Sequence, residues 1–126
     1  MEFTILARLD GLNEYTKACR SNAYVGNKMK MENELIIKAA IKKAILSPIS
    51  KYPVKLIIDW YEPNRKRDID NITFATKFIL DSLVKTKILQ DDSQKYINEI
   101  EHHVYVDKNK PHIDVKIVEL GGKQNE

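Results

Sequence analysis

Cysteine is nearly absent from this chain of 126 residues, since Cys19 is the only one. A single thiol excludes an internal disulfide and any zinc site built from several cysteines. No arrangement of His with Asn or Asp accompanies Cys19, so we interpret it as an ordinary reduced cysteine. The chain also lacks an apolar run of about 18 residues, and its start, MEFTILARLD, lacks the regions of a signal peptide. The expected location is therefore cytoplasmic.

The length fits one domain covering residues 1–126 and leaves little room for two. Hydrophobic residues make up 43% of the chain and charged residues 31%, which suits a modest core inside a solvated surface. A domain of this size has an unfavourable ratio of surface to volume. Apolar surface buried against a partner subunit would therefore add to its stability.

The formal net charge is only +3, which by itself says little about binding partners. The distribution of charge is more informative, because the basic residues gather in small groups. These groups are Lys28/Lys30, Lys42/Lys43, Arg65–Arg67, Lys85/Lys87 and Lys108/Lys110. Separate basic groups with acidic residues between them are typical of a surface that contacts phosphates at selected places. On charge alone, an ordinary solvated surface accounts for the same pattern.

Hydrophobic periodicity predicts six elements and no internal repeat. The expected strands are Phe3–Leu9, Val54–Tyr61, and a hairpin of Tyr96–Val106 with His112–Leu120; the expected helices are Met29–Leu46 and Asn71–Lys85. The polar stretch Asp10–Asn27 shows no clear period and is predicted to be a long loop. The order β-α-β-α-β-β predicts an α/β (α+β) domain, in which two helices pack against one mixed sheet.

The segment from Arg65 to Asn71 (RKRDIDN) is the most informative part of the chain. In an extended stretch, Asp68 and Asp70 point the same way and are able to share a hard cation such as Mg²⁺. Arg65, Lys66 and Arg67 precede them and would hold a nucleic acid strand by its phosphates. The alternative is purely structural: Asp70 caps the following helix, and Asp68 pairs with Arg67.

Two further features belong with this segment. The pair Asp91-Asp92 follows the second predicted helix after a short connection that is able to return it to the sheet. Lys77 lies seven positions after Asp70 (77 − 70 = 7), about two helical turns, so both project from nearly the same face. A lysine there would stabilise charge in a transition state. The alternatives are an Asp-rich turn and a solvated helix lysine.

Taken together, these residues resemble the RusA family of Holliday junction resolvases. The family carries a basic stretch running into Asp-x-Asp-Asn, then a helix with a lysine, then an Asp-Asp pair. The matching segments here are Lys66–Asn71, the helix with Lys77 and Ile79–Leu83, and Asp91-Asp92. The likeness is concentrated between Tyr61 and Val106, while the residues before Tyr61 agree mainly in their layout of strand, polar loop and helix.

The resemblance implies a homodimeric, Mg²⁺-dependent endonuclease of DNA recombination and repair, often encoded by prophages, that nicks four-way DNA junctions symmetrically. Mn²⁺ is the expected substitute for Mg²⁺. Carried over to this sequence, Asp68, Asp70 and Asp92 are the catalytic acids and metal ligands, with Asp91 as an accessory neighbour. The family's lysine comes one turn after the second acid, where Phe74 stands here. A catalytic Lys77 therefore requires an insertion of about one turn at the helix start.

The expected mechanism is metal-assisted hydrolysis, in which the aspartates hold one or two ions that activate water and stabilise charge on the scissile phosphate. We expect the three carboxylates to converge on one pocket. The basic stretch Arg65–Arg67, with Lys28 and Lys30, would position the DNA backbone. Two other functions stay open: a non-catalytic phage protein that binds branched DNA, and another metal-dependent phosphodiesterase acting on RNA or flap DNA. Because a junction needs two cuts, we expect a two-fold dimer with one site per chain.

Overall fold

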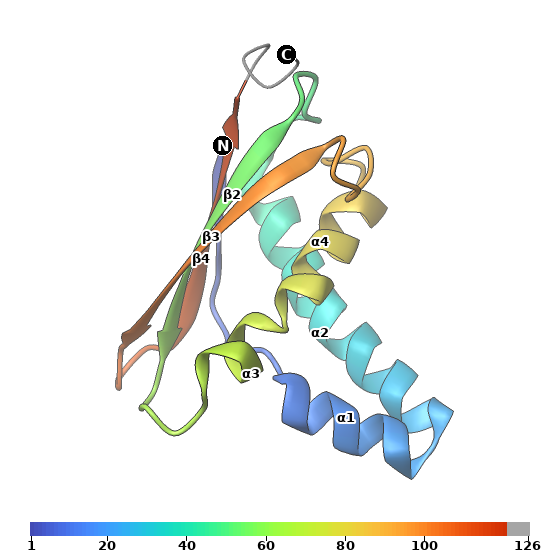
Figure 1. The fold of residues 1–126 in the computed structure, drawn as a ribbon, viewed down its shortest axis with the longest axis vertical. Coiled ribbons are helices and arrows are strands. Elements are labelled where there is room, and N and C mark those ends of the chain that lie inside the picture. The colour runs from blue at the N-terminus through green and yellow to red at the C-terminus, as the bar shows by residue number, and fades with distance from the viewer. Residues whose placement is uncertain (121–126) are drawn as a thin grey trace.

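A computed structural model describes residues 1–120 and shows a four-stranded mixed sheet with helices on one of its faces (Figure 1). The strands are β1 (Glu2–Ile5), β2 (Val54–Glu62), β3 (Ile97–Val106) and β4 (His112–Glu119). The helices are α1 (Leu12–Ser21), α2 (Ala23–Ala44), α3 (Ile69–Thr73) and α4 (Thr76–Lys85). The predicted class, a mixed sheet with helices packed against it, is confirmed. Within residues 1–120, no helix has the length and apolar character needed to cross a membrane.

The strands lie in the order β1-β4-β2-β3. β2 is central: it pairs parallel with β3 and antiparallel with β4, and β4 pairs antiparallel with β1. The predicted hairpin of the last two strands is therefore wrong, because β2 lies between them. The turn from Asp107 to Pro111 crosses two strand spacings, about 10 Å, which a connection of this length spans without strain.

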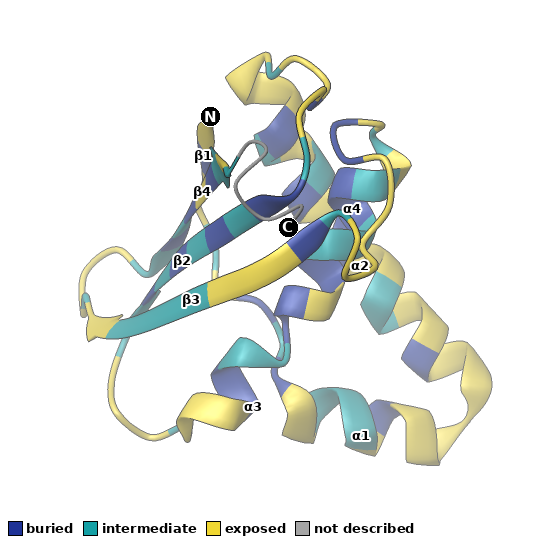
Figure 2. Ribbon diagram, turned by 45° about the horizontal axis from the view of Figure 1, so that its top comes forward, coloured by how far each residue is buried: buried dark blue, intermediate teal, exposed yellow. Residues whose placement is uncertain are grey.

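The core lies where the helices meet the sheet, and β2 shows why. Its residues alternate along its whole length between buried and half-buried, as the pleat of a strand requires. Val54, Leu56, Ile58 and Trp60 are buried towards the helices. Phe78, Ile79 and Leu83 of α4 and Ile37 and Ile41 of α2 belong to the same cluster. Figure 2 shows these buried positions in the middle of the molecule and the exposed ones on the outer sides of the helices.

The predicted loop from Asp10 to Asn27 is wrong, because it contains α1 and the start of α2. Of the ten residues of α1, Ala18 alone is buried, yet Leu12, Tyr15 and Ala18 recur every three residues, a helical spacing that the prediction overlooked because no N-cap side chain marks the start. Its start is instead set by hydrogen bonding: the backbone N–H of Gly11 donates to Glu14 Oε1 at 2.9 Å. The first strand is also shorter than predicted: β1 ends at Ile5, where its pairing with β4 ends, and does not reach Leu9.

The second predicted helix is two helices, α3 and α4, with a tight turn between them. At the turn, the N–H of Ala75 donates to Ile72 O at 3.3 Å, and the N–H of Lys77 donates to Phe74 O at 3.1 Å. Such bonds to the third residue back narrow the helix locally. Phe74 turns into a ring cluster with Tyr15, at 5.4 Å between centroids. This break separates the residues of α3 from those of α4.

Candidate functional site

The first two predicted acids lie at the start of α3, just after β2. Asp68 is the N-cap residue, with extended backbone (φ −69°, ψ 157°) and no side-chain capping hydrogen bond. Asp70 lies in the first turn, so the prediction that it caps the helix is wrong. Because helical geometry begins at Ile69, the argument from an extended chain does not apply to this pair. Residues two apart on a helix do not face each other.

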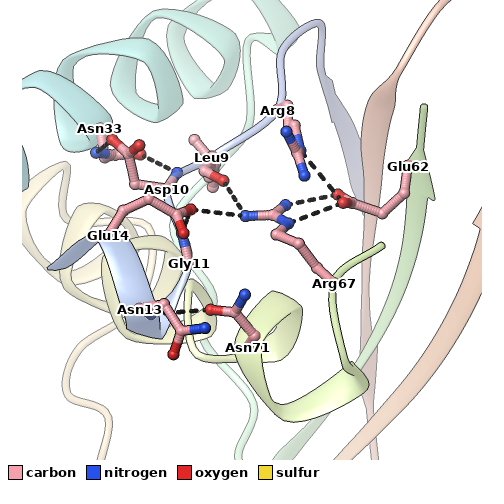
Figure 3. Close-up of polar contacts among 10 residues, drawn as sticks. All are labelled: Arg8, Leu9, Asp10, Gly11, Asn13, Glu14, Asn33, Glu62, Arg67 and Asn71. Atoms are coloured by element: carbon pink, nitrogen blue, oxygen red, sulfur yellow. Dashed lines mark hydrogen bonds and ion pairs between the residues drawn. The ribbon is translucent and has the colours of Figure 1, made fainter. Parts of the chain in front are cut away.

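A buried ion-pair network holds this segment against the sheet (Figure 3). Arg67 donates through Nε and Nη2 to the two carboxylate oxygens of Glu62, at 2.9 and 2.7 Å. Its Nη1 donates to Leu9 O at 3.1 Å and to Glu14 Oε1 at 3.2 Å. The side chains of Arg67 and Glu62 are 10% and 5% exposed. We therefore correct the predicted DNA contact of Arg67: its guanidinium is occupied within the chain, and Arg67 positions the neighbouring Asp68.

Glu14 joins the network from α1. Burial opposes ionisation of Glu14, but the hydrogen bond from the Gly11 N–H and the positive charge of Arg67 outweigh it, so the pKa of Glu14 lies below its usual value. A carboxyl group with a lowered pKa stabilises the fold above its unfolded pKa, and the contribution is lost as pH falls through the folded pKa. The network therefore weakens in acid.

Asn71 fixes α3 to the start of α1. Its Oδ1 accepts a hydrogen bond from the backbone N–H of Asn13 at 2.9 Å, and the residue is buried. Gly11 lies so close that a Cβ there would stand 2.5 Å from Asn71 Oδ1, 2.6 Å from Asn71 O and 2.9 Å from Arg67 Nη1. The approach of these two segments therefore requires glycine at position 11.

We expect Gly11→Ala to lower the free energy of unfolding by about 1–3 kcal/mol, because the new methyl group overpacks against backbone that is held on both sides. Urea denaturation measures the change. Gly26→Ala is the matched control, since its Cβ would meet the Cys19 side chain at 2.7 Å but no main-chain atom closer than 3.3 Å, against 2.6 Å at Gly11. A smaller loss is expected for the control, and unchanged stability of Gly11→Ala would contradict the required close approach.

Asp92 lies at the other end of the molecule. It belongs to the connection from α4 to β3, which is tied to the start of β2 by the N–H of Val54 donating to Tyr96 O at 2.8 Å. Asp68 follows the far end of β2, and the nine residues of that strand span about 26 Å from first to last Cα. Figure 1 shows α3 and this connection at opposite ends of α4.

The three predicted ligands consequently do not meet within one chain. Among residues 1–120, no group of three or more His, Cys, Asp or Glu side chains is placed to hold a metal ion. The expected convergence of Asp68, Asp70 and Asp92 on one pocket is not found, because the length of α4 keeps them apart. All three, with Asp91, are exposed and make no hydrogen bond or ion pair to other described side chains. One or two such free carboxylates, with water and phosphate, form a donor set that suits Mg²⁺.

The geometric argument for Lys77 fails, because Asp70 and Lys77 belong to separate helices. Lys77 is exposed on α4, and its Nζ lies 4.0 Å from Asp81 Oδ2 one turn further on. That pair is an ordinary helix surface contact. A catalytic role for Lys77 stays a prediction.

The remaining basic residues of the predicted DNA contact differ in whether they form ion pairs within the chain. Arg65, Lys66 and Lys28 are exposed, and none of their side chains forms an ion pair with the part of the chain that the structure describes. Lys30 is different, because its Nζ lies 3.7 Å from Glu34 and 3.3 Å from Asp81. Its charge is balanced within the chain, so the predicted DNA contact of Lys30 has no support from the geometry.

The sequence did not predict the residues whose hydrogen bonds hold α1, α2 and α3 together around this segment. Asn33 is an example: its Oδ1 accepts from the N–H of Asp10 at 2.9 Å, and its Nδ2 donates to Asp10 Oδ2 at 2.8 Å. Such partners lie far apart along the chain, so no local pattern marks them. One signal was available: a glutamate three residues after Gly11 is the spacing of a capping box.

In a comparison with protein families, residues 8–118 match the model of endodeoxyribonuclease RusA. The matched range includes the network around Arg67 and all four free aspartates. A search of curated proteins finds no match. Because the family model spans most of the 126 residues, the chain belongs to the RusA endodeoxyribonuclease family.

Proposed function

We propose that this protein is a Mg²⁺-dependent endodeoxyribonuclease that resolves four-way (Holliday) DNA junctions by paired, symmetric nicks. The observation that carries the proposal is the state of Asp68, Asp70, Asp91 and Asp92 in a member of this family. Their carboxylates are exposed and unpaired, whereas Glu14, Glu34 and Glu62 are neutralised by neighbouring bases. Free carboxylates on a protein of net positive charge are available to a cation and, through it, to phosphate.

Asp68, Asp70 and Asp92 are the residues that would hold the metal. When bound, Mg²⁺ or Mn²⁺ would supply positive charge beside the scissile phosphate and promote ionisation of water. The chain itself supplies position and charge. Arg67 fixes the segment that carries two of the acids, and Arg65 and Lys66 beside it hold the DNA backbone.

The separation of the acids points to a site shared between two chains. Bringing Asp92 to Asp70 within one chain would require α4 to leave the core, where Phe78, Ile79 and Leu83 are fully buried. A two-fold dimer avoids that loss of burial, since Asp92 of the partner subunit completes the set around Asp68 and Asp70. The same symmetry yields two equal sites, one for each strand that a junction requires to be cut.

The test is to incubate the protein with four-way, duplex and single-stranded DNA, with Mg²⁺ or with chelator. The expected result is a pair of symmetric nicks in the four-way junction, present only with the metal. Equal cutting of RNA or flap DNA would favour a different phosphodiesterase. Junction binding without any cutting, under all metal conditions, would favour a non-catalytic protein that binds branched DNA.

We expect Arg65→Ala with Lys66→Ala to weaken junction binding and to flatten its dependence on salt. Each lost phosphate contact lowers the slope of log affinity against log salt by about 0.9. Binding measured between 50 and 200 mM salt, roughly the range in which such contacts show, gives the slope. Lys42→Ala with Lys43→Ala is a matched control, because it removes the same charge from another exposed pair. An equal change in both double variants would show that Arg65 and Lys66 are ordinary solvated surface residues without a specific contact to the DNA backbone.

A further inference from the structure

β3 is an edge strand of the sheet that residues 1–120 form. Among the described strands it pairs only with β2. The N–H of Asp107, just past its end, donates to Glu62 O at 2.8 Å. In a parallel strand, the backbone N–H and C=O groups of every second residue face the partner strand. Because the N–H of Asp107 faces β2, the backbone groups of Ile100, His102 and Val104 face the outer edge of the sheet. A long edge of this kind is a template for another strand.

The side chains of β3 are also poorly covered. Through their pairing with buried residues of β2, Ile100, His102 and Val104 belong to the helix-facing side of the sheet. Nevertheless Ile100 is 37% exposed and Val106 is 46% exposed. Figure 2 shows β3 at the front, exposed or half-buried over most of its length. Apolar side chains on an unpaired edge indicate a surface that is covered by a further strand.

We propose that β3 is the surface through which two copies of this chain pair, antiparallel, about a two-fold axis at His102. The inference rests on the proposed dimeric function and names the interface. In this register Ile100 faces Val104 of the partner subunit, and Glu101 faces the partner's His103. The edge-facing backbone groups then exchange about six hydrogen bonds across the axis.

Charge selects this register over its neighbours. Glu101 and His103 share the face of the sheet that carries no helix, and within one chain their side chains are 3.0 Å apart. Glu101 also lies 3.0 Å from Lys55, and His103 lies 2.7 Å from Asp59. With the axis at His102, each carboxylate faces an imidazole of the other chain. Moving the axis to Glu101 would place two carboxylates directly opposite each other, which destabilises an antiparallel pair. Moving it to His103 would leave each Glu101 opposite Tyr105 of the partner subunit, without an imidazole.

The same pairing brings the segments that carry the acids of two chains to the same end of the sheet. Val106, at the end of β3, lies beside Glu62, at the end of β2. Antiparallel pairing places the beginning of the partner's β3 next to Val106, and with it the connection that carries Asp92. That connection then arrives about two strand spacings, roughly 10 Å, from the end of β2, where the segment leading to Asp68 begins.

The outer face of α2 is a second exposed apolar surface. Tyr24, Met31 and Leu35 line a groove there of about 730 Å³. Its rim carries both signs of charge, Lys28, Lys38 and Lys85 with Glu32, and a helix, unlike β3, offers no row of outward-facing backbone groups to a second copy. We therefore assign the second copy to β3, and α2 provides the control.

A cysteine scan tests the register directly. In a Cys19→Ser background, single cysteines replace Glu101, His102 or His103, and the thiols are oxidised with diamide. His102→Cys is expected to form a covalent dimer, because opposite Cα atoms of a hydrogen-bonded pair lie about 5.5 Å apart, within the range of a disulfide. Glu101→Cys and His103→Cys should cross-link several-fold less. Equal cross-linking at all three positions, preferential cross-linking at 101 or 103, or none at any would overturn the proposal.

Charge reversal tests it without a covalent bond. Glu101→Lys and His103→Glu should each weaken the dimer about tenfold, since the first removes both carboxylate–imidazole pairs across the axis and the second places two pairs of carboxylates there. Mixing the two variants should restore wild-type affinity, because the new lysine then faces the new glutamate. Sedimentation equilibrium gives the dissociation constants, and circular dichroism checks folding.

Leu35→Glu is the control and should leave the dissociation constant unchanged. A dimer broken by Leu35→Glu but not by the β3 variants would overturn this interface and leave the proposed function standing. A wild-type protein that stays at the 14.6 kDa chain mass at micromolar concentration, with and without junction DNA, would overturn both. A dimer that pairs through β3 but cuts no DNA would overturn the proposed function alone.

Discussion

Asp70→Asn and Asp92→Asn should each reduce junction cleavage roughly a hundredfold or more, while junction binding stays intact or tightens. Each variant deletes a proposed metal ligand, and it also removes a negative charge that faces phosphate. Both side chains are exposed and unpaired, so stability should change by less than about 0.5 kcal/mol. Single-turnover cleavage and gel-shift titration measure the two effects separately.

Glu32→Gln is the control, because it removes one exposed carboxylate from α2, away from the proposed site. It should cut at the wild-type rate. If Asp70→Asn or Asp92→Asn also cuts at that rate, the residue concerned is only a helix-terminal or turn residue.

Mixing the two inactive variants distinguishes a shared site from one built within a single chain. In a mixed dimer with shared sites, one site contains both replacements and the other contains neither. Activity should therefore return at one site per dimer, and the product should be a single nick per junction. If each site belonged to one chain, every site in the mixture would lack a ligand and no activity would return.

Arg67→Ala should lower the free energy of unfolding by about 3–5 kcal/mol, because it leaves the buried carboxylate of Glu62 without its main partner. Arg8 also donates to Glu62, at 3.2 Å, but its side chain is 40% exposed and contacts only one oxygen. Arg65→Ala, two residues earlier and exposed, should change stability by less than about 0.5 kcal/mol. Urea denaturation gives both values.

Two further variants separate positioning from simple charge balance. Arg67→Lys keeps the charge but loses the paired hydrogen bonds of the guanidinium, so intermediate stability and reduced cleavage are expected. Glu62→Leu combined with Arg67→Met removes both buried charges and should recover part of the stability lost in Arg67→Ala. Wild-type stability of Arg67→Ala would show that the ion pair contributes little to the fold.

Local patterns in the sequence determined much of the fold. The β-branched and aromatic residues from Val54 to Tyr61 predicted β2 within one residue, and the apolar side of Met29–Leu46 predicted most of α2. α1 was missed because its short apolar side, Leu12, Tyr15 and Ala18, does not stand out from the polar residues around it, although the spacing is helical. The break between α3 and α4 was missed for a related reason: Phe74 and Ala75 are compatible with a continuous helix, and ring packing against Tyr15 accompanies the turn.

The family could also be predicted from the sequence, because a basic stretch, two acidic segments and their spacing are properties of the chain alone. The tertiary structure decided which of these residues are free. Arg67 and Arg65 are equivalent in sequence, yet only Arg67 meets a buried carboxylate. The strand order and the distance between Asp70 and Asp92 were likewise decided in three dimensions. Periodicity records which face of an element is buried, but what buries it depends on contacts between residues far apart in the chain.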